Sequence, residues 1–236
     1  MDNFPGMYFD PLYMIILAIG FVLSAGASFW TKSAVKKWSQ VPTSRGMTGA
    51  QVAEAILDAE GIRDVNVEQV GGFLSDHYDP RSRTLRLSPD IYGGRSISAA
   101  GIAAHEVGHA LQHAQGYLPM RMRQAMVPVA NIGTNVGIWM VIIGMMIGLT
   151  GLSTLGVVVF AGFVLFTIVT LPVEFDASLR ARKVLQKHSL LGPQELAGVS
   201  KVLTAAAATY LAAAVSAILQ LLYWAMRAGL LGGRDD

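Results

Sequence analysis

The chain of 236 residues contains no cysteine, which excludes disulfides, thiolate metal ligands and cysteine nucleophiles. Charge is also scarce, because only 14% of the residues are charged, whereas 53% are hydrophobic. With a mean hydropathy of +0.45, the chain is too apolar for an ordinary soluble domain of this size, and we predict an integral membrane protein. The net charge of +2 is small and the basic residues form no stripe, so nucleic acid is not expected as a partner.

Long stretches without charge indicate where the chain crosses the lipid bilayer. Residues 12–30 have the length of one transmembrane helix, and residues 124–173 have the length of two, with the obvious turn at 150–154. Residues 202–226 are also uncharged but rich in alanine. They form either a fourth span or a long cytoplasmic helix packed on the core, and we favour the span.

The distribution of lysine and arginine predicts the orientation. Lys32, Lys36 and Lys37 follow the first apolar segment, whereas residues 1–11 contain only acidic charges. The positive-inside rule therefore places the N-terminus outside and the next region in the cytoplasm. Without a basic n-region, the first segment is expected to be retained and not cleaved as a signal peptide. The predicted parts are a first transmembrane helix (1–30), a cytoplasmic region (31–123), a transmembrane hairpin (124–173), a second cytoplasmic segment (174–201) and a C-terminal apolar helix with its tail (202–236).

The first cytoplasmic region shows both helical and strand periodicity. Thr48 and Gln51 match a capping box that opens a short helix. Alternation between residues 65 and 88 predicts a small antiparallel sheet, which either offers an edge strand to an extended substrate or merely covers a helix. The Ala-rich residues 98–115 read as a helix that Ser96 or Ser98 caps and Gly116 closes.

That helix carries His105-Glu106-Val107-Gly108-His109, which matches the His-Glu-x-x-His signature of zinc proteases. On a helix the two histidines lie one turn apart on one face, so both can bind one metal ion. Glu106 then points toward the position at which the metal activates water, as a general base would. Because the flanking residues are small and apolar, we expect these polar side chains to be buried, and a metal would satisfy them.

A catalytic zinc site usually has a third protein ligand. We choose Glu174, because the predicted hairpin returns the chain there to the side that holds the two histidines, and Asp176 is the reserve. His77 could reach the cleft as a ligand or as a donor to the oxyanion of the transition state. His113 is expected to be an ordinary helix-end histidine and His188 a solvated surface residue.

Three motifs together resemble the neutral zinc metallopeptidases of bacterial membranes, the YugP-like family: His-Glu-x-x-His with the following Ala-Leu-Gln, residues 76–80 (Asp-His-Tyr-Asp-Pro) and residues 174–178 (Glu-Phe-Asp-Ala-Ser). The last segment is also similar to the Glu-x-x-x-Asp region of HtpX-type and CAAX-prenyl proteases, in which the Glu is the third zinc ligand. This chain departs from that pattern, because Ser178 stands where Asp is expected and Asp176 comes two residues earlier. The resemblance implies a membrane-embedded endopeptidase of the bacterial inner membrane.

The sequence therefore predicts a mainly α multi-pass membrane protein of about four transmembrane helices with a cytoplasmic zincin-like α+β portion. Its predicted function is that of a zinc endopeptidase acting on peptides or membrane proteins at the cytoplasmic face, with one zinc ion held by His105, His109 and Glu174 in a gluzincin-like set. Glu106 is the expected general base, and His77, Tyr78 or Tyr117 is expected to stabilise the oxyanion. The alternative is a non-proteolytic membrane scaffold with a structural metal site.

Overall fold

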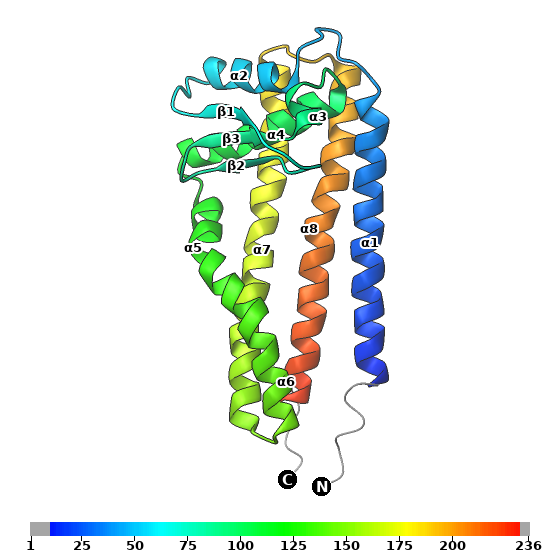
Figure 1. Cartoon of the computed structure of the whole chain (residues 1–236), viewed down its shortest axis with the longest axis vertical. Coiled ribbons are helices and arrows are strands. Elements are labelled where there is room, and N and C mark those ends of the chain that lie inside the picture. The colour runs from blue at the N-terminus through cyan, green and yellow to red at the C-terminus, as the bar shows by residue number, and fades with distance from the viewer. Residues whose placement is uncertain (1–9, 232–236) are drawn as a thin grey trace. The chain divides into compact units, whose positions relative to one another are not determined.

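A computed structural model describes residues 10–231, which are mostly helical (Figure 1). The elements in chain order are α1 (Pro11–Ser39), α2 (Gly49–Ala59), β1 (Asn66–Gln69), β2 (His77–Asp79), β3 (Thr84–Leu87), α3 (Pro89–Tyr92), α4 (Ile97–Ala114), α5 (Leu118–Ile132), the π-helical turn η1 (Gly133–Gly137), α6 (Ile138–Met146), α7 (Thr150–Lys187) and α8 (Pro193–Arg227). The prediction of a mainly α protein with a small sheet is confirmed.

Within residues 10–231, four helical segments are long and apolar enough to cross a bilayer. They are α1, the continuous run from α5 through α6 (Leu118–Met146), α7 and α8. Residues 202–226 lie inside α8, so the length and composition of that helix agree with the fourth span that we favoured.

The helices differ from the prediction at their ends. Helix α1 continues past Trp30 to Ser39, because lysines are good helix formers and the first proline after it is Pro42. The predicted hairpin turn at 150–154 was placed too late. The chain turns at 147–149, where Gly148 adopts a φ of +71°, and residues 150–154 already belong to α7.

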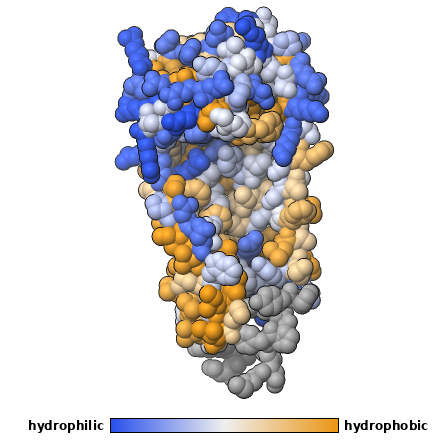
Figure 2. All heavy atoms as spheres, viewed as in Figure 1, coloured by the Kyte–Doolittle hydropathy of each residue, from blue (hydrophilic) through white to orange (hydrophobic). Residues whose placement is uncertain are grey.

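The chain folds as two compact units, of which one comprises residues 10–26, 122–171 and 210–231 of the described chain. Its buried residues include Val141, Phe160 and Tyr223. Its outward-facing side chains are largely apolar, as Figure 2 shows for α5–α7, and Phe21 is 74% exposed. A surface on which so many large apolar side chains are exposed is one that faces lipid.

The other unit comprises residues 27–121 and 172–209. Helix α2 packs on α4 through residues such as Val52 and Ile56. The predicted capping box is present: the backbone N–H of Gln51 donates to the Thr48 hydroxyl, and the backbone N–H of Thr48 donates to the side-chain oxygen of Gln51. Polar side chains cover the outer surface of α2 and the strands (Figure 2). This unit therefore has the character of a water-facing domain, built around α4.

The sheet is mixed and not antiparallel as predicted. Its order is β1-β3-β2, in which β2 pairs with β3 in antiparallel fashion and β1 pairs with β3 in parallel. The prediction failed because residues 70–76 do not form a tight hairpin. The hydroxyl of Ser75 donates to the carbonyl of Gly71, and the loop carries the chain past β3 to its far edge. Strands β1 and β2 therefore lie on opposite sides of β3, and β2 forms an edge that contacts α4.

Candidate metal centre

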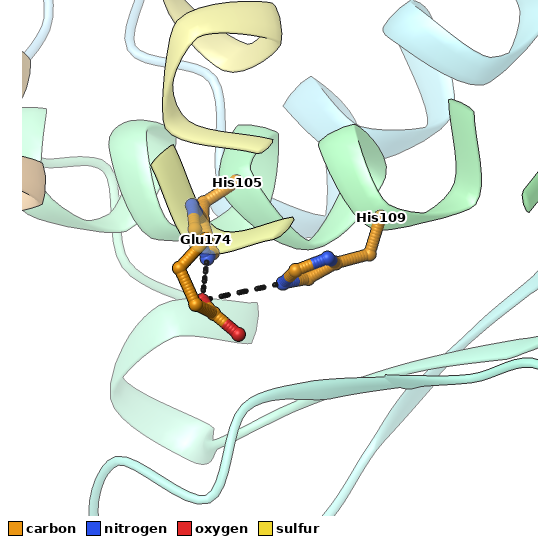
Figure 3. Close-up of side chains that lie close together, drawn as sticks. All are labelled: His105, His109 and Glu174. Atoms are coloured by element: carbon orange, nitrogen blue, oxygen red, sulfur yellow. Dashed lines mark hydrogen bonds and ion pairs between the residues drawn. The ribbon is translucent and has the colours of Figure 1, made fainter. Parts of the chain in front are cut away.

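Helices α4 and α7 bring His105, His109 and Glu174 together (Figure 3). Ser96 caps α4 by accepting the Ala99 N–H, and the helix then places the two histidines one turn apart. Nε2 of His105 lies 3.3 Å from Oε2 of Glu174, and Nε2 of His109 lies 3.6 Å from the same oxygen.

These distances fit a single zinc ion. Two ligand atoms that each lie about 2.0–2.1 Å from one zinc ion at a tetrahedral angle are about 3.3 Å apart. One ligand atom from each of the three residues lies within 4.8 Å of the others. Two imidazoles and a carboxylate are moreover a donor set that zinc commonly takes in catalytic sites.

The tautomer of His109 is fixed by a fully buried amide. The Nδ1 of His109 donates to Oε1 of Gln112 over 3.0 Å, and Nε2 of Gln112 donates to the carbonyl of Val173 and to Oδ2 of Asp176, both over 2.8 Å. Because both N–H groups of this amide face oxygen acceptors, the reverse orientation of Gln112 would set its oxygen against the Val173 carbonyl and the Asp176 carboxylate and lose both of these hydrogen bonds. The lone pair of His109 is therefore left on Nε2, which faces Glu174.

Ser178 orients the other imidazole. Its hydroxyl lies 3.2 Å from Nδ1 of His105, and when it accepts that N–H the lone pair of His105 is on Nε2, on the side of Glu174. Gln112 and Ser178 thus each hold one imidazole so that its Nε2 can bind a metal.

The site is buried and negatively charged. Glu174 is 2% exposed and Glu106 is 7% exposed. Burial by itself lowers the pKa of His109, but the nearby carboxylates of Glu174 and Glu106 outweigh it, and the net effect raises the pKa. Two buried carboxylates beside two imidazoles favour the binding of a cation, because an isolated buried charge is costly.

The remaining candidates lie outside this group. His77 is an exposed residue at the start of β2, and its Nδ1 lies 2.8 Å from the Ser75 carbonyl. Asp176 is turned to Gln112 and to Arg180. His113, in the last turn of α4, shares a 2.8 Å hydrogen bond with the hydroxyl of Tyr78.

His188 was expected to be solvated, and the structure corrects this. Its Nε2 lies 2.6 Å from Oε1 of Glu60, which also accepts from Lys187. His188 directly follows the end of α7, and Glu60 directly follows the end of α2, so the two helix ends bring this pair together.

The sequence analysis did not identify Gln112 and Ser178 as partners of the histidines. The one available signal for Gln112 was its spacing, since residues three apart on a helix are neighbours. Ser178 had no such signal, because only the packing of α7 on α4 brings it to His105.

Long apolar helices combined with a buried group of two histidines from an HExxH motif on α4 and a glutamate on α7 are typical of a membrane-associated metallopeptidase. Consistently, the chain belongs to the family described as "Putative neutral zinc metallopeptidase", whose model matches residues 13–229. It is 45% identical over 225 residues to a Bacillus subtilis (strain 168) protein named "Putative membrane protease YugP". The aligned region covers 95% of this chain and 98% of that protein. No solved structure matches the chain.

Proposed function

We propose that this chain is a zinc-dependent endopeptidase with one zinc ion held by His105, His109 and Glu174. The observation that carries the proposal is that ligand atoms of these three residues lie within 4.8 Å of one another, with both histidines on the helix that also bears Glu106. Family membership supports zinc and peptidase chemistry, and the apolar helices support a location in a membrane.

Zinc bound there would polarise a peptide carbonyl and lower the pKa of water. In this proposal Glu106 takes a proton from the attacking water and delivers it to the leaving amine. Among the described residues, no side chain or backbone group is found in a hydrogen bond with the Glu106 carboxylate, which leaves it free for this task. His77, on the strand that contacts α4, is proposed to donate to the developing oxyanion, with Tyr78 and Tyr117 as alternatives.

A cavity of about 680 Å³, lined in part by the first turn of α4, supports peptide binding. Ser98 lines it and lies on the same face of α4 as His105, two turns away, or about 10 Å along the axis. An extended peptide covers that distance in about three residues. Three basic residues, Lys32, Lys36 and Arg95, line the cavity, whereas Asp90 is its single acidic residue. Because of this excess of positive charge, we propose that the cavity receives acidic residues of the substrate.

The proposed location is the inner membrane of a bacterium, with the metal centre on the cytoplasmic side. The support is the cluster of lysines directly after the first apolar segment and the basic residues that follow Glu174. Peptides or membrane proteins presented at the inner face are the proposed substrates.

A scaffold with a structural metal site is the alternative. Structural zinc sites are closed by four protein ligands. Within residues 10–231 the group has three His, Asp or Glu members, which leaves a position for substrate or water and favours catalysis.

The test compares Glu106→Gln with wild type for zinc content, by elemental analysis, and for cleavage of an unfolded protein substrate in lipid nanodiscs. We expect an unchanged zinc content and a loss of activity on the order of 100-fold or more. The exposed Glu54 on α2 provides the matched control Glu54→Gln, which should cleave normally. Full activity in a zinc-loaded Glu106→Gln protein would refute the proposal, and a zinc-loaded wild type without cleavage would favour the scaffold.

A further inference from the structure

A second cavity, of about 510 Å³, lies between α1 and α8 within the unit that holds the metal centre. The two helices are joined beside it by the hydroxyl of Thr31, which donates to the carbonyl of Ala205 over 2.8 Å. Residues of both α1 and α8 line the cavity, and the ones that matter here are Trp30, Ser33, Lys37, Trp38, Ser200 and Lys201. None of them belongs to the metal centre or lines the cavity of about 680 Å³.

Two positive charges converge on one side chain in this cavity. The Nζ atoms of Lys37 and Lys201 each lie 5.7 Å from the ring centroid of Trp38. In the described part of the chain, neither lysine forms a salt bridge with a carboxylate. Because both ammonium groups flank the same ring, an anion that contacts both lysines would offset the repulsion between their charges. The hydroxyls of Ser33 and Ser200 can add donors to such an anion.

The cavity lies at the end of the apolar stretch on both helices. On α1, Lys32 is the first charged residue after residues 12–30, and the cavity begins at Trp30. On α8, Lys201 is the last charged residue before the uncharged residues 202–226. Tryptophan and lysine at such boundaries are characteristic of the depth of lipid head groups.

We propose that this cavity binds the head group of an anionic phospholipid, with the phosphate between Lys37 and Lys201. Basic pockets between membrane helices are a recurrent way to hold anionic lipids. A choline head group carries its own cation next to the phosphate, which the two lysines would repel, so the site discriminates against zwitterionic lipid. The proposal does not depend on the peptidase activity.

The test is a competition between phosphatidylglycerol and phosphatidylcholine, offered in equimolar amounts to the delipidated full chain in detergent and read by native mass spectrometry. Each lysine near a lipid surface favours an anionic lipid by about 1 kcal/mol. For two lysines we therefore expect wild type to prefer phosphatidylglycerol by more than about tenfold. In Lys37→Gln/Lys201→Gln the preference should fall to near parity. Lys37→Arg/Lys201→Arg should retain it, which distinguishes lost charge from lost folding.

The matched control is Lys36→Gln/Lys183→Gln. It removes the same net charge, and Lys36 is the neighbour of Lys37 that lines the other cavity. This variant should keep the wild-type preference. Equal losses in the two glutamine variants would reduce the effect to general electrostatic attraction and overturn the proposal, as would a wild type without preference. Inorganic phosphate in excess should not displace the lipid, and displacement would identify a small-anion site instead.

Discussion

A Cβ atom added to Gly108 would lie 2.6 Å from the carbonyl oxygen of Ala177, closer than real Cβ atoms approach an oxygen. Gly108 immediately precedes His109, and Ala177 lies on α7 one turn after Glu174. The missing side chain therefore lets α4 and α7 touch through their backbones where the histidines meet the glutamate. The distances of 3.3 and 3.6 Å between the imidazoles and Glu174 depend on this contact.

Replacing Gly108 by alanine should separate the two helices. The obstructing atom is a backbone oxygen in the middle of a helix, which cannot move away as a flexible side chain would. We expect a lower melting temperature, corresponding to about 1–3 kcal/mol of overpacking, together with loss of bound zinc. Gly26→Ala is the control, because a Cβ there meets no atom within 4 Å. Wild-type zinc content in Gly108→Ala would show that the helix contact does not set the site.

Gln112→Ala should weaken metal binding without touching a ligand. The substitution removes the acceptor that holds Nδ1 of His109 and the donors to Asp176 and the Val173 carbonyl. Loss of such outer partners typically lowers metal affinity about 10–100-fold. Competition with a chelator measures the change, and Gln186→Ala, at an exposed position of α7, is the control. An unaltered zinc affinity in Gln112→Ala would mean that the amide only fills space.

The local parts of the site were predictable from the sequence, and the parts that depend on tertiary packing were only partly so. The spacing of His105 and His109 follows from helix geometry alone. The proximity of Glu174 could be inferred because a pair of transmembrane helices returns the chain to its starting side. The mixed sheet could not be inferred, since alternation gives the strands but not the path of the loop between β1 and β2.

The departure from the Glu-x-x-x-Asp pattern shows the same limit. In the sequence, Ser178 and Asp176 look like one misplaced partner for one ligand. In the structure they serve two different histidines: Ser178 contacts His105 directly, and Asp176 reaches His109 through Gln112. Only the packing of α7 against α4 reveals this division.

The hairpin of β2 and β3 should show a defined acid sensitivity through Asp79. Its carboxylate accepts from the Ser82 hydroxyl, the Arg81 N–H and Arg86, and these bonds lower its pKa to about 2. Since the pKa in the folded state lies below the usual 3.8, the stabilisation is present above about pH 4 and disappears as the pH falls toward 2.

Melting temperatures of wild type and Asp79→Asn across this range test the point. Wild type should melt higher than the variant above about pH 4, and the two should converge near pH 2. Asp58→Asn is the control, because Asp58 accepts no side-chain hydrogen bond from the described residues. A difference between wild type and Asp79→Asn that stays constant with pH would contradict the assignment.

Ser178 offers a graded test of how strongly His105 must be oriented. Its hydroxyl lies 3.2 Å from Nδ1, a rather long hydrogen bond to a neutral acceptor. Ser178→Ala should lower zinc affinity by about tenfold, because the ring is then free to turn. Ser178→Asp should bind zinc at least as tightly as wild type, since a carboxylate forms a stronger, charge-assisted bond with the imidazole N–H. Chelator competition at constant pH ranks the three proteins. If the alanine variant matched wild type, the orientation of His105 would have to come from Glu174 and the metal alone.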